Sequence, residues 1–135
     1  MSKKNIFIIF VVILVVLAAA IGLFLYSQKP QDLSKVSDDE IISLLNKNTD
    51  AKEYMQNHAD FKIDEKEILT KEVITSRQNG AEFREVYQSL ELQDNRYIRV
   101  KLINSAGDKG LVAVVDFKKQ TAINAFGLLL LSGTN

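Results

Sequence analysis

An uninterrupted apolar stretch near the N-terminus constrains this chain more than any other feature. Residues 6 to 26 form a run of 21 residues without a charged or strongly polar side chain. A helix of that length reaches roughly 30 Å, the thickness of the hydrocarbon core of a bilayer. A core helix of a small globular domain has no need to be apolar on every face. The sequence therefore predicts a membrane anchor over residues 1–26, whose apolar surface includes Ile6, Phe10, Leu14, Leu17, Ile21 and Leu25.

The charges that flank this run bear on its orientation in the membrane. Lys3 and Lys4 precede the run, and Lys29 and Lys35 follow it. Positive charge favours the cytoplasmic side, but two lysines on each side give no decision by number alone. A short basic tail immediately before an apolar run is how an export signal begins. We therefore expect a single-pass protein of the cell membrane, with a cytoplasmic N-terminus and an extracytoplasmic C-terminal domain.

The apolar run has a second interpretation, as a cleaved signal peptide. Three small residues, Ala18, Ala19 and Ala20, resemble a cleavage site after a shorter apolar segment. Cleavage there would leave the apolar residues 21–26 as the new terminus. The retained anchor explains the whole run and is the prediction, with cleavage as the alternative.

The composition of the rest of the chain excludes several classes of function. Removing Lys3 and Lys4 with the anchor leaves 15 basic against 17 acidic residues, a net charge of −2. This balance lacks the positive surface that nucleic-acid binding requires, so no nucleic-acid partner is expected. The chain has no cysteine. Disulfides, thiolate metal sites, a catalytic thiol and a lipid-modified cysteine are therefore excluded.

Residues 27–36 are polar, contain the single proline of the chain, and predict a linker between the anchor and a domain over residues 37–135. Ser37 followed by Glu40 is a capping-box pattern that predicts the start of a helix. The apolar stripe that continues to Leu45 supports this helix. Residues 46–49 could interrupt it, and residues 50–58 continue or restart it.

From residue 61 the apolar pattern changes to that of strands. Residues 64–76 are rich in β-branched side chains but also in Glu and Lys, so both strand and helix stay open. Asn79-Gly80 predicts a two-residue hairpin turn that joins a strand ending near Arg77 to one over residues 82–92. Further strands are predicted over residues 96–104, 111–117 and 121–131.

Together these elements predict an α+β fold, in which one or two helices pack on a four- to five-stranded antiparallel meander. Ile98, Val100 and Leu102 would point towards the helices. The alternating residues Tyr97, Arg99 and Lys101 would lie on an opposite, solvated face, together with residues 83, 85 and 87.

The C-terminal stretch over residues 123–131 is unusually apolar and ends in four leucines. It is too short to span a bilayer. The structural interpretation is a last strand buried on both faces of the sheet. The functional interpretation is an apolar patch, including Phe126, Leu128 and Leu130, that contacts a partner chain or the membrane surface.

Residues that could support chemistry are few. His58 and Asp60 form a His-x-Asp pair that could belong to a metal site, but a histidine at a helix end is the simpler interpretation. His58 with a serine and Asp116 could be assembled into a triad, but the chain has no Gly-x-Ser-x-Gly elbow. The sequence predicts no catalytic, cofactor-binding or metal site and no cofactor. The chain is therefore not expected to be an enzyme.

The last third of the chain resembles a family of small extracytoplasmic domains. The strand over residues 97–102, a glycine-containing turn and the sequence Val114-Val115-Asp116 are similar to the second half of a PepSY domain. The family usually has Thr-Gly after this aspartate, where this chain has Lys119-Gln120. The resemblance implies a helix paired with an antiparallel sheet, and a binding or inhibitory module at the cell envelope.

Two classes of function follow from these features. The first is a membrane-tethered extracytoplasmic binding or accessory module that acts through a protein partner. The second is a structural subunit of a surface assembly, similar to a pilin, because a pilin also places an apolar helix before an antiparallel sheet. Against the second, the chain lacks a Gly or Ala processing site before the apolar run and a Glu near its start.

Overall fold

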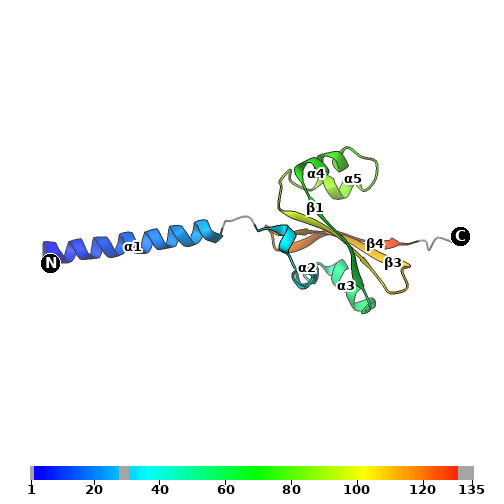
Figure 1. Ribbon diagram of the computed structural model, residues 1–135, viewed down its shortest axis with the longest axis horizontal. Helices are drawn as coiled ribbons and strands as arrows, with labels where there is room; N and C mark the ends of the chain where they lie inside the picture. The colour runs from blue at the N-terminus through cyan, green and yellow to red at the C-terminus, as the bar shows by residue number, and fades with distance from the viewer. Residues whose placement is uncertain (1, 28–30, 131–135) are drawn as a thin grey trace. The chain divides into compact units, whose positions relative to one another are not determined.

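The computed structural model describes residues 2–27 and 31–130, and these form parts of two compact units, Met1–Gln31 and Asp32–Asn135. The first unit contains helix α1 (Lys3–Ser27), shown in blue in Figure 1. Its segment Lys3–Tyr26 is long and apolar enough to cross a membrane, by length and composition. All six residues predicted for the apolar surface of the anchor lie in this helix and are exposed.

The second unit is an α+β domain built on a four-stranded antiparallel sheet, which confirms the predicted fold class. The strands are β1 (Lys62–Leu69), β2 (Tyr97–Ile103), β3 (Lys109–Asp116) and β4 (Thr121–Leu129). They lie in the order β1-β2-β3-β4, so each strand pairs with its neighbour in sequence and β1 and β4 form the two edges.

Helices cover both faces of this sheet (Figure 1). We call the face that carries Ile98 and Val100 the first face, and the face that carries Tyr97 and Arg99 the second face. Helices α2 (Asp38–Leu45) and α3 (Thr49–Asn57) cover the first face. Helices α4 (Lys71–Gln78) and α5 (Arg84–Gln88) pack on the second. The domain therefore has three layers, and the sequence predicted two.

Local sequence explains the helices of the first face. The hydroxyl of Ser37 accepts a hydrogen bond from the N–H of Glu40 at 3.2 Å, which confirms the predicted start of α2. The side chain of Asn48 caps α3 in the same way, by accepting from the N–H of Ala51 at 3.0 Å. A short 3-10 turn (Leu33–Lys35) precedes α2. Leu33, from the segment predicted as a linker, is buried in the core. Pro30 lies outside the described residues.

Residues 64–76, for which the sequence allowed either a strand or a helix, contain part of each. Strand β1 ends at Leu69, and α4 begins at Lys71 after the hydroxyl of Thr70 accepts from the N–H of Val73 at 3.2 Å. The predicted hairpin at Asn79-Gly80 is wrong. Asn79 has a right-handed φ of −92° and ends α4, whereas a two-residue hairpin turn needs a positive φ there.

The predicted strand over residues 82–92 is also wrong, because this segment forms α5 and a loop. Its residue Tyr87 packs with Leu69, Ile74 and Tyr97 in a second core on the second face. The prediction that Tyr97 lies on a solvated face is therefore wrong. Tyr97 is buried because α4 and α5, which were not predicted, cover this part of the sheet. Arg99 and Lys101 lie beyond these helices and keep partial exposure.

The sequence suggested that the last strand is buried on both faces of the sheet, and this prediction is wrong. Most of β4 is half-buried, and the side chain of Leu129 is 84 % exposed. β4 is an edge strand, so its outer side has no neighbour in the sheet, and the short α5 covers only part of its second face. Leu131 lies outside the described residues.

Candidate functional site

A groove on the second face lies beside α5, where the helices leave the sheet partly uncovered. Its hollow measures about 170 Å³. Six apolar residues from α5 and its N-terminal flank, β3, β4 and the residue after β4 line it: Phe83, Val86, Val112, Phe126, Leu128 and Leu130. Tyr87 and the charged residues Glu65, Arg99 and Lys101 complete the lining. We call this feature the second-face groove. Its floor is apolar and its β1–β2 side is charged.

Phe83 forms the outer wall of the groove in a strained conformation. Its φ of 54° is left-handed, and it precedes α5 without a side-chain capping bond. Such a conformation is rare for a bulky residue and costs roughly 1–3 kcal/mol. The ring is nevertheless 53 % exposed and stacks on Phe126 with 5.1 Å between centroids. An exposed aromatic ring held in this way is typical of a contact surface rather than of a core.

The charged side of the groove consists of ion pairs between β1 and β2. The guanidinium of Arg99 lies 3.3 Å from the Glu65 carboxylate and 3.6 Å from that of Glu67. The ammonium of Lys101 lies 3.1 Å from Asp64 and 3.7 Å from Glu65. The two cations are 22 % and 21 % exposed and the carboxylates are 32–52 % exposed, so solvent screens these pairs in part and each contributes on the order of 1 kcal/mol. Arg99 and Lys101 can therefore exchange these partners for polar groups of a ligand at little cost.

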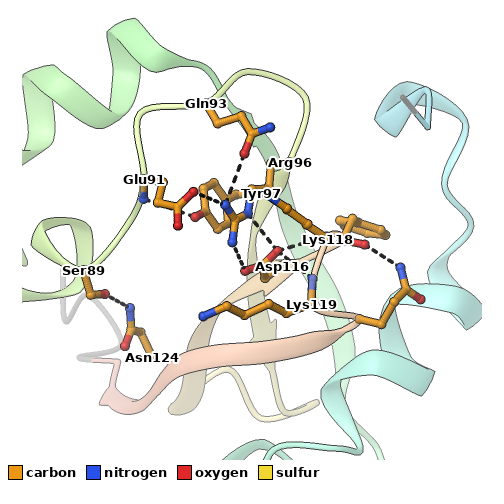
Figure 2. A network of polar contacts seen from close by, with 11 residues as sticks. Ser89, Glu91, Gln93, Arg96, Tyr97, Asp116, Lys118, Lys119 and Asn124 are labelled. Atoms are coloured by element: carbon orange, nitrogen blue, oxygen red, sulfur yellow. Dashed lines mark hydrogen bonds and ion pairs between the residues drawn. The ribbon is translucent and has the colours of Figure 1, made fainter. Parts of the chain in front are cut away.

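A β-bulge in β4 fixes the position of α5 over the sheet. The register shifts between Val112 and Val114, and Asn124 opposite the shift has a left-handed φ of 51°. Its side-chain amide donates to the carbonyl oxygen of Val86 at 2.9 Å and to the hydroxyl of Ser89 at 2.7 Å. Figure 2 shows the second of these bonds. Asn124 thus ties the wall of the groove to the strand that forms its floor.

A buried ion pair closes the far end of the second face (Figure 2). The guanidinium of Arg96 donates to both carboxylate oxygens of Asp116, at 3.0 and 2.9 Å. The two side chains are 4 % and 1 % exposed. Asp116 also accepts from the N–H groups of Lys118 and Lys119, at the turn into β4. The aspartate of the Val114-Val115-Asp116 motif is therefore a structural anchor in this chain.

The partners of this pair determine the protonation of Asp116. Burial alone would raise the pKa of Asp116, but the hydrogen bonds from Arg96 and from the turn hold it below its ordinary value. Arg96 also donates to Glu91 at 2.5 Å and to Gln93 at 3.1 Å. Because both residues lie in the loop from α5 to β2, the ion pair also fixes the C-terminal side of the α5 wall.

The side chains of His58, Asp60 and Asp116 each have structural partners. The imidazole lies at the C-terminal end of α3 and packs on Tyr54 with 4.7 Å between ring centroids. The Asp60 carboxylate accepts bonds from the N–H and hydroxyl of Ser105, which lower its pKa. Asp116 is held by Arg96 instead. Among residues 2–27 and 31–130, no three His, Cys, Asp or Glu side chains form a group that could hold a metal ion.

The structure brings together all three residues of the predicted partner patch. Phe126, Leu128 and Leu130 line the second-face groove. Sequence reasoning missed the opposite wall, Phe83 and Val86, because it placed these residues in a strand. The left-handed conformation of Phe83 could not be predicted from the sequence, because glycine and asparagine are the residues that usually adopt it.

The chain matches no known family model, no curated protein and no solved structure. The resemblance to PepSY domains therefore stays a prediction, and a function can be inferred only from the local geometry.

Proposed function

We propose that this chain is a membrane-tethered accessory module, which binds a protein partner outside the cytoplasm through the second-face groove. The observation that carries the proposal is the combination of an exposed, strained aromatic wall with an apolar floor and a charged side. The helix α1, which suits a bilayer by length and composition, supports the tether. The short basic N-terminal tail supports a cytoplasmic N-terminus.

The size of the groove favours a protein segment over a small molecule. Pockets for small ligands usually enclose about 300–1,000 Å³ and bury most of the ligand. The second-face groove offers about 170 Å³. This volume suits one or two apolar side chains of a partner, with Arg99 and Lys101 beside them to pair with its polar groups. Interfaces of this type place an apolar anchor at the centre and charged residues at the rim.

A second candidate function is a structural subunit of a surface assembly. The order of elements favours it, because the apolar α1 precedes a domain built on an antiparallel sheet. An assembly subunit would contact copies of itself through this groove, whereas an accessory module would bind a different protein there.

The experiment that tests the proposal is site-specific photo-crosslinking of the full chain in its native membrane. A photoreactive phenylalanine analogue at Phe83 should give a discrete adduct with a foreign protein. The same analogue at Leu92 is the matched control, because both side chains are 53 % exposed and Leu92 does not line the groove. Equal adducts from both positions, or none from Phe83, would contradict the proposal. Adducts from Phe83 with the chain itself alone, and none with a foreign protein, would favour the assembly subunit.

The tether and its orientation need a separate measurement. Because the chain has no cysteine, a single Leu92→Cys substitution gives a unique thiol. In intact cells this thiol should react with a membrane-impermeant maleimide if the domain lies outside. Reaction only after lysis would contradict the proposed orientation.

A further inference from the structure

The two edges of the sheet differ in a way that bears on association. Edge strand β1 has five charged residues among its eight: Lys62, Asp64, Glu65, Lys66 and Glu67. Charged edges discourage pairing with another chain. Edge strand β4 has no charged residue and no proline among its nine. Within the described residues, β4 pairs with β3 alone, so its outer backbone groups are open to a further strand.

The hydrogen-bond pattern shows which backbone groups face outward. The N–H of Leu130 donates to the carbonyl oxygen of Asp108 at 2.8 Å, towards the β3 side. Backbone groups alternate in direction along an antiparallel strand. The N–H and C=O groups of Ala125, Gly127 and Leu129 therefore point to the open edge.

These three positions lie on the first face, and the shapes they present there are complementary. Gly127 pairs with Leu111, a residue of the first-face core, which assigns Ala125, Gly127 and Leu129 to that face. Leu129 is a large apolar side chain that is 84 % exposed. Ala125 and Gly127 line a hollow of about 350 Å³ beside α3. Tyr54, Leu111 and Phe126 give it further apolar lining, and its α3 side also carries the polar residues Asp50, Glu53, Asn57 and His58. One strand thus carries both an apolar projection and a hollow.

We propose that two copies of this chain pair through their β4 strands, antiparallel about a two-fold axis at Gly127. In this register Ala125 of each copy lies opposite Leu129 of the other. Each Leu129 then reaches the hollow beside the α3 helix of the other copy, and the small residue opposite leaves room for it. Roughly six backbone hydrogen bonds would form from the three outward-pointing residues of each strand. The result is a continuous eight-stranded sheet with an isologous interface.

A second copy suits this edge better than an unrelated strand for two reasons. The projection and the hollow lie two residues either side of one glycine, which is the spacing that a two-fold axis requires. An uncharged strand also meets its own copy without like-charge repulsion. The inference does not rest on the groove wall Phe83, because the projection Leu129 lies on the first face. Phe126 is the one residue that lines both the groove and the hollow.

The absence of native cysteine makes the register testable by disulfide formation in the full chain in its membrane. Residues paired on the axis have Cα atoms about 5.5 Å apart, within disulfide range. Gly127→Cys should therefore form a disulfide-linked dimer under mild oxidation. A Cβ at position 127 would meet no atom closer than the Gly110 carbonyl oxygen at 4.0 Å, so the fold should tolerate it. Lys66→Cys, exposed on the charged edge β1, is the control and should remain monomeric.

The flanking positions distinguish this register from random collision. Ala125→Cys and Leu129→Cys should each fail to cross-link alone, because identical residues lie about 14 Å apart along the strands. Co-expressed with different tags, they should form a mixed dimer.

A charge at the projection gives an independent check. Adding Leu129→Lys to Gly127→Cys should reduce the cross-linked dimer at least several-fold, without unfolding, because this side chain is exposed. A Gly127→Cys yield no greater than that of Lys66→Cys would overturn the proposal. Equal yields from all three β4 positions would overturn it as well. Phe83→Asn, which alters the groove, should leave the dimer yield unchanged, so failure of either proposal can be recognised separately.

Discussion

Replacing one member of the buried Arg96–Asp116 pair should destabilise the domain severely. In Asp116→Asn, the guanidinium of Arg96 would stay buried at 4 % exposure with no charged partner except the exposed Glu91. Removing one partner of a buried pair costs about 3–5 kcal/mol, because the remaining charge is desolvated without compensation. Since domains of this size are stable by about 5–15 kcal/mol, the variant should be only marginally folded.

Urea unfolding of the full chain in detergent, followed by tyrosine fluorescence, measures this loss. Tyr97 is a suitable reporter because it is buried and Arg96 lies over its ring at 4.8 Å. The double variant Arg96→Met with Asp116→Asn removes the orphaned charge. It should be less destabilised than the sum of the two single variants by about 1.5–3 kcal/mol. Additivity within about 0.5 kcal/mol would refute the argument that the two side chains act as a pair.

The same pair sets a pH dependence. The pKa of Asp116 is lowered in the folded state, so its contribution is complete above its unfolded pKa of about 3.9. The contribution is lost as the pH falls through the lower folded value. Unfolding free energy of the wild type should therefore decrease below about pH 4, and Asp116→Asn should lack this part of the decrease.

Substitutions at three further positions test the construction of the groove by the same unfolding assay. Phe83→Gly should be more stable than Phe83→Ala by about 1 kcal/mol, because glycine adopts the left-handed φ without strain; the reverse order would contradict the assigned conformation. Gly110→Ala should cost about 1–3 kcal/mol, because its Cβ would lie 3.0 Å from the Leu102 carbonyl oxygen and 3.2 Å from Leu130. A neutral effect there would contradict the close approach of Gly110 to the Leu102 carbonyl oxygen and to Leu130. Asn124→Gly should cost about 1–2 kcal/mol through its two lost hydrogen bonds to the α5 region. Asn124→Ala should cost about 1 kcal/mol more through backbone strain, and equal losses would argue against the bulge.

Much of the fold follows from patterns that the sequence displays directly. The capping residue Ser37 and the alternation around Val100 are local signals, and the structure places a helix and a strand at these positions. Such signals work because the hydrogen bond of a cap and the two-residue period of a strand depend only on neighbouring residues.

The second helical layer was not predicted, for physical reasons that its residues make clear. Val73, Ile74 and Thr75 are β-branched and favour strands, but in α4 the cap at Thr70 and the burial of Ile74 outweigh that preference. Helix α5 has five residues, too few for a recognisable helical period. Without these helices, Tyr97 could only be assigned to a solvated face.

Only one side of the second-face groove could be predicted from the sequence. The apolar stretch over residues 123–131, with its four consecutive leucines, identified Phe126, Leu128 and Leu130. The opposite wall depends on tertiary contacts, namely the bonds from Asn124 to the α5 region and the stacking of Phe83 on Phe126. Neither contact has a local signature.

The measurement that tests the central claim most directly is affinity capture of the full chain from native membranes in mild detergent, with a matched pair of variants. Phe83→Asn keeps a residue that tolerates the left-handed φ but removes the aromatic wall of the groove. Leu92→Asn removes an equally exposed side chain outside the groove. If the groove binds a protein partner, a stoichiometric foreign chain should accompany the wild type and Leu92→Asn, and should be lost from Phe83→Asn. A partner retained by all three proteins, or no stoichiometric partner with the wild type, would contradict the proposed function.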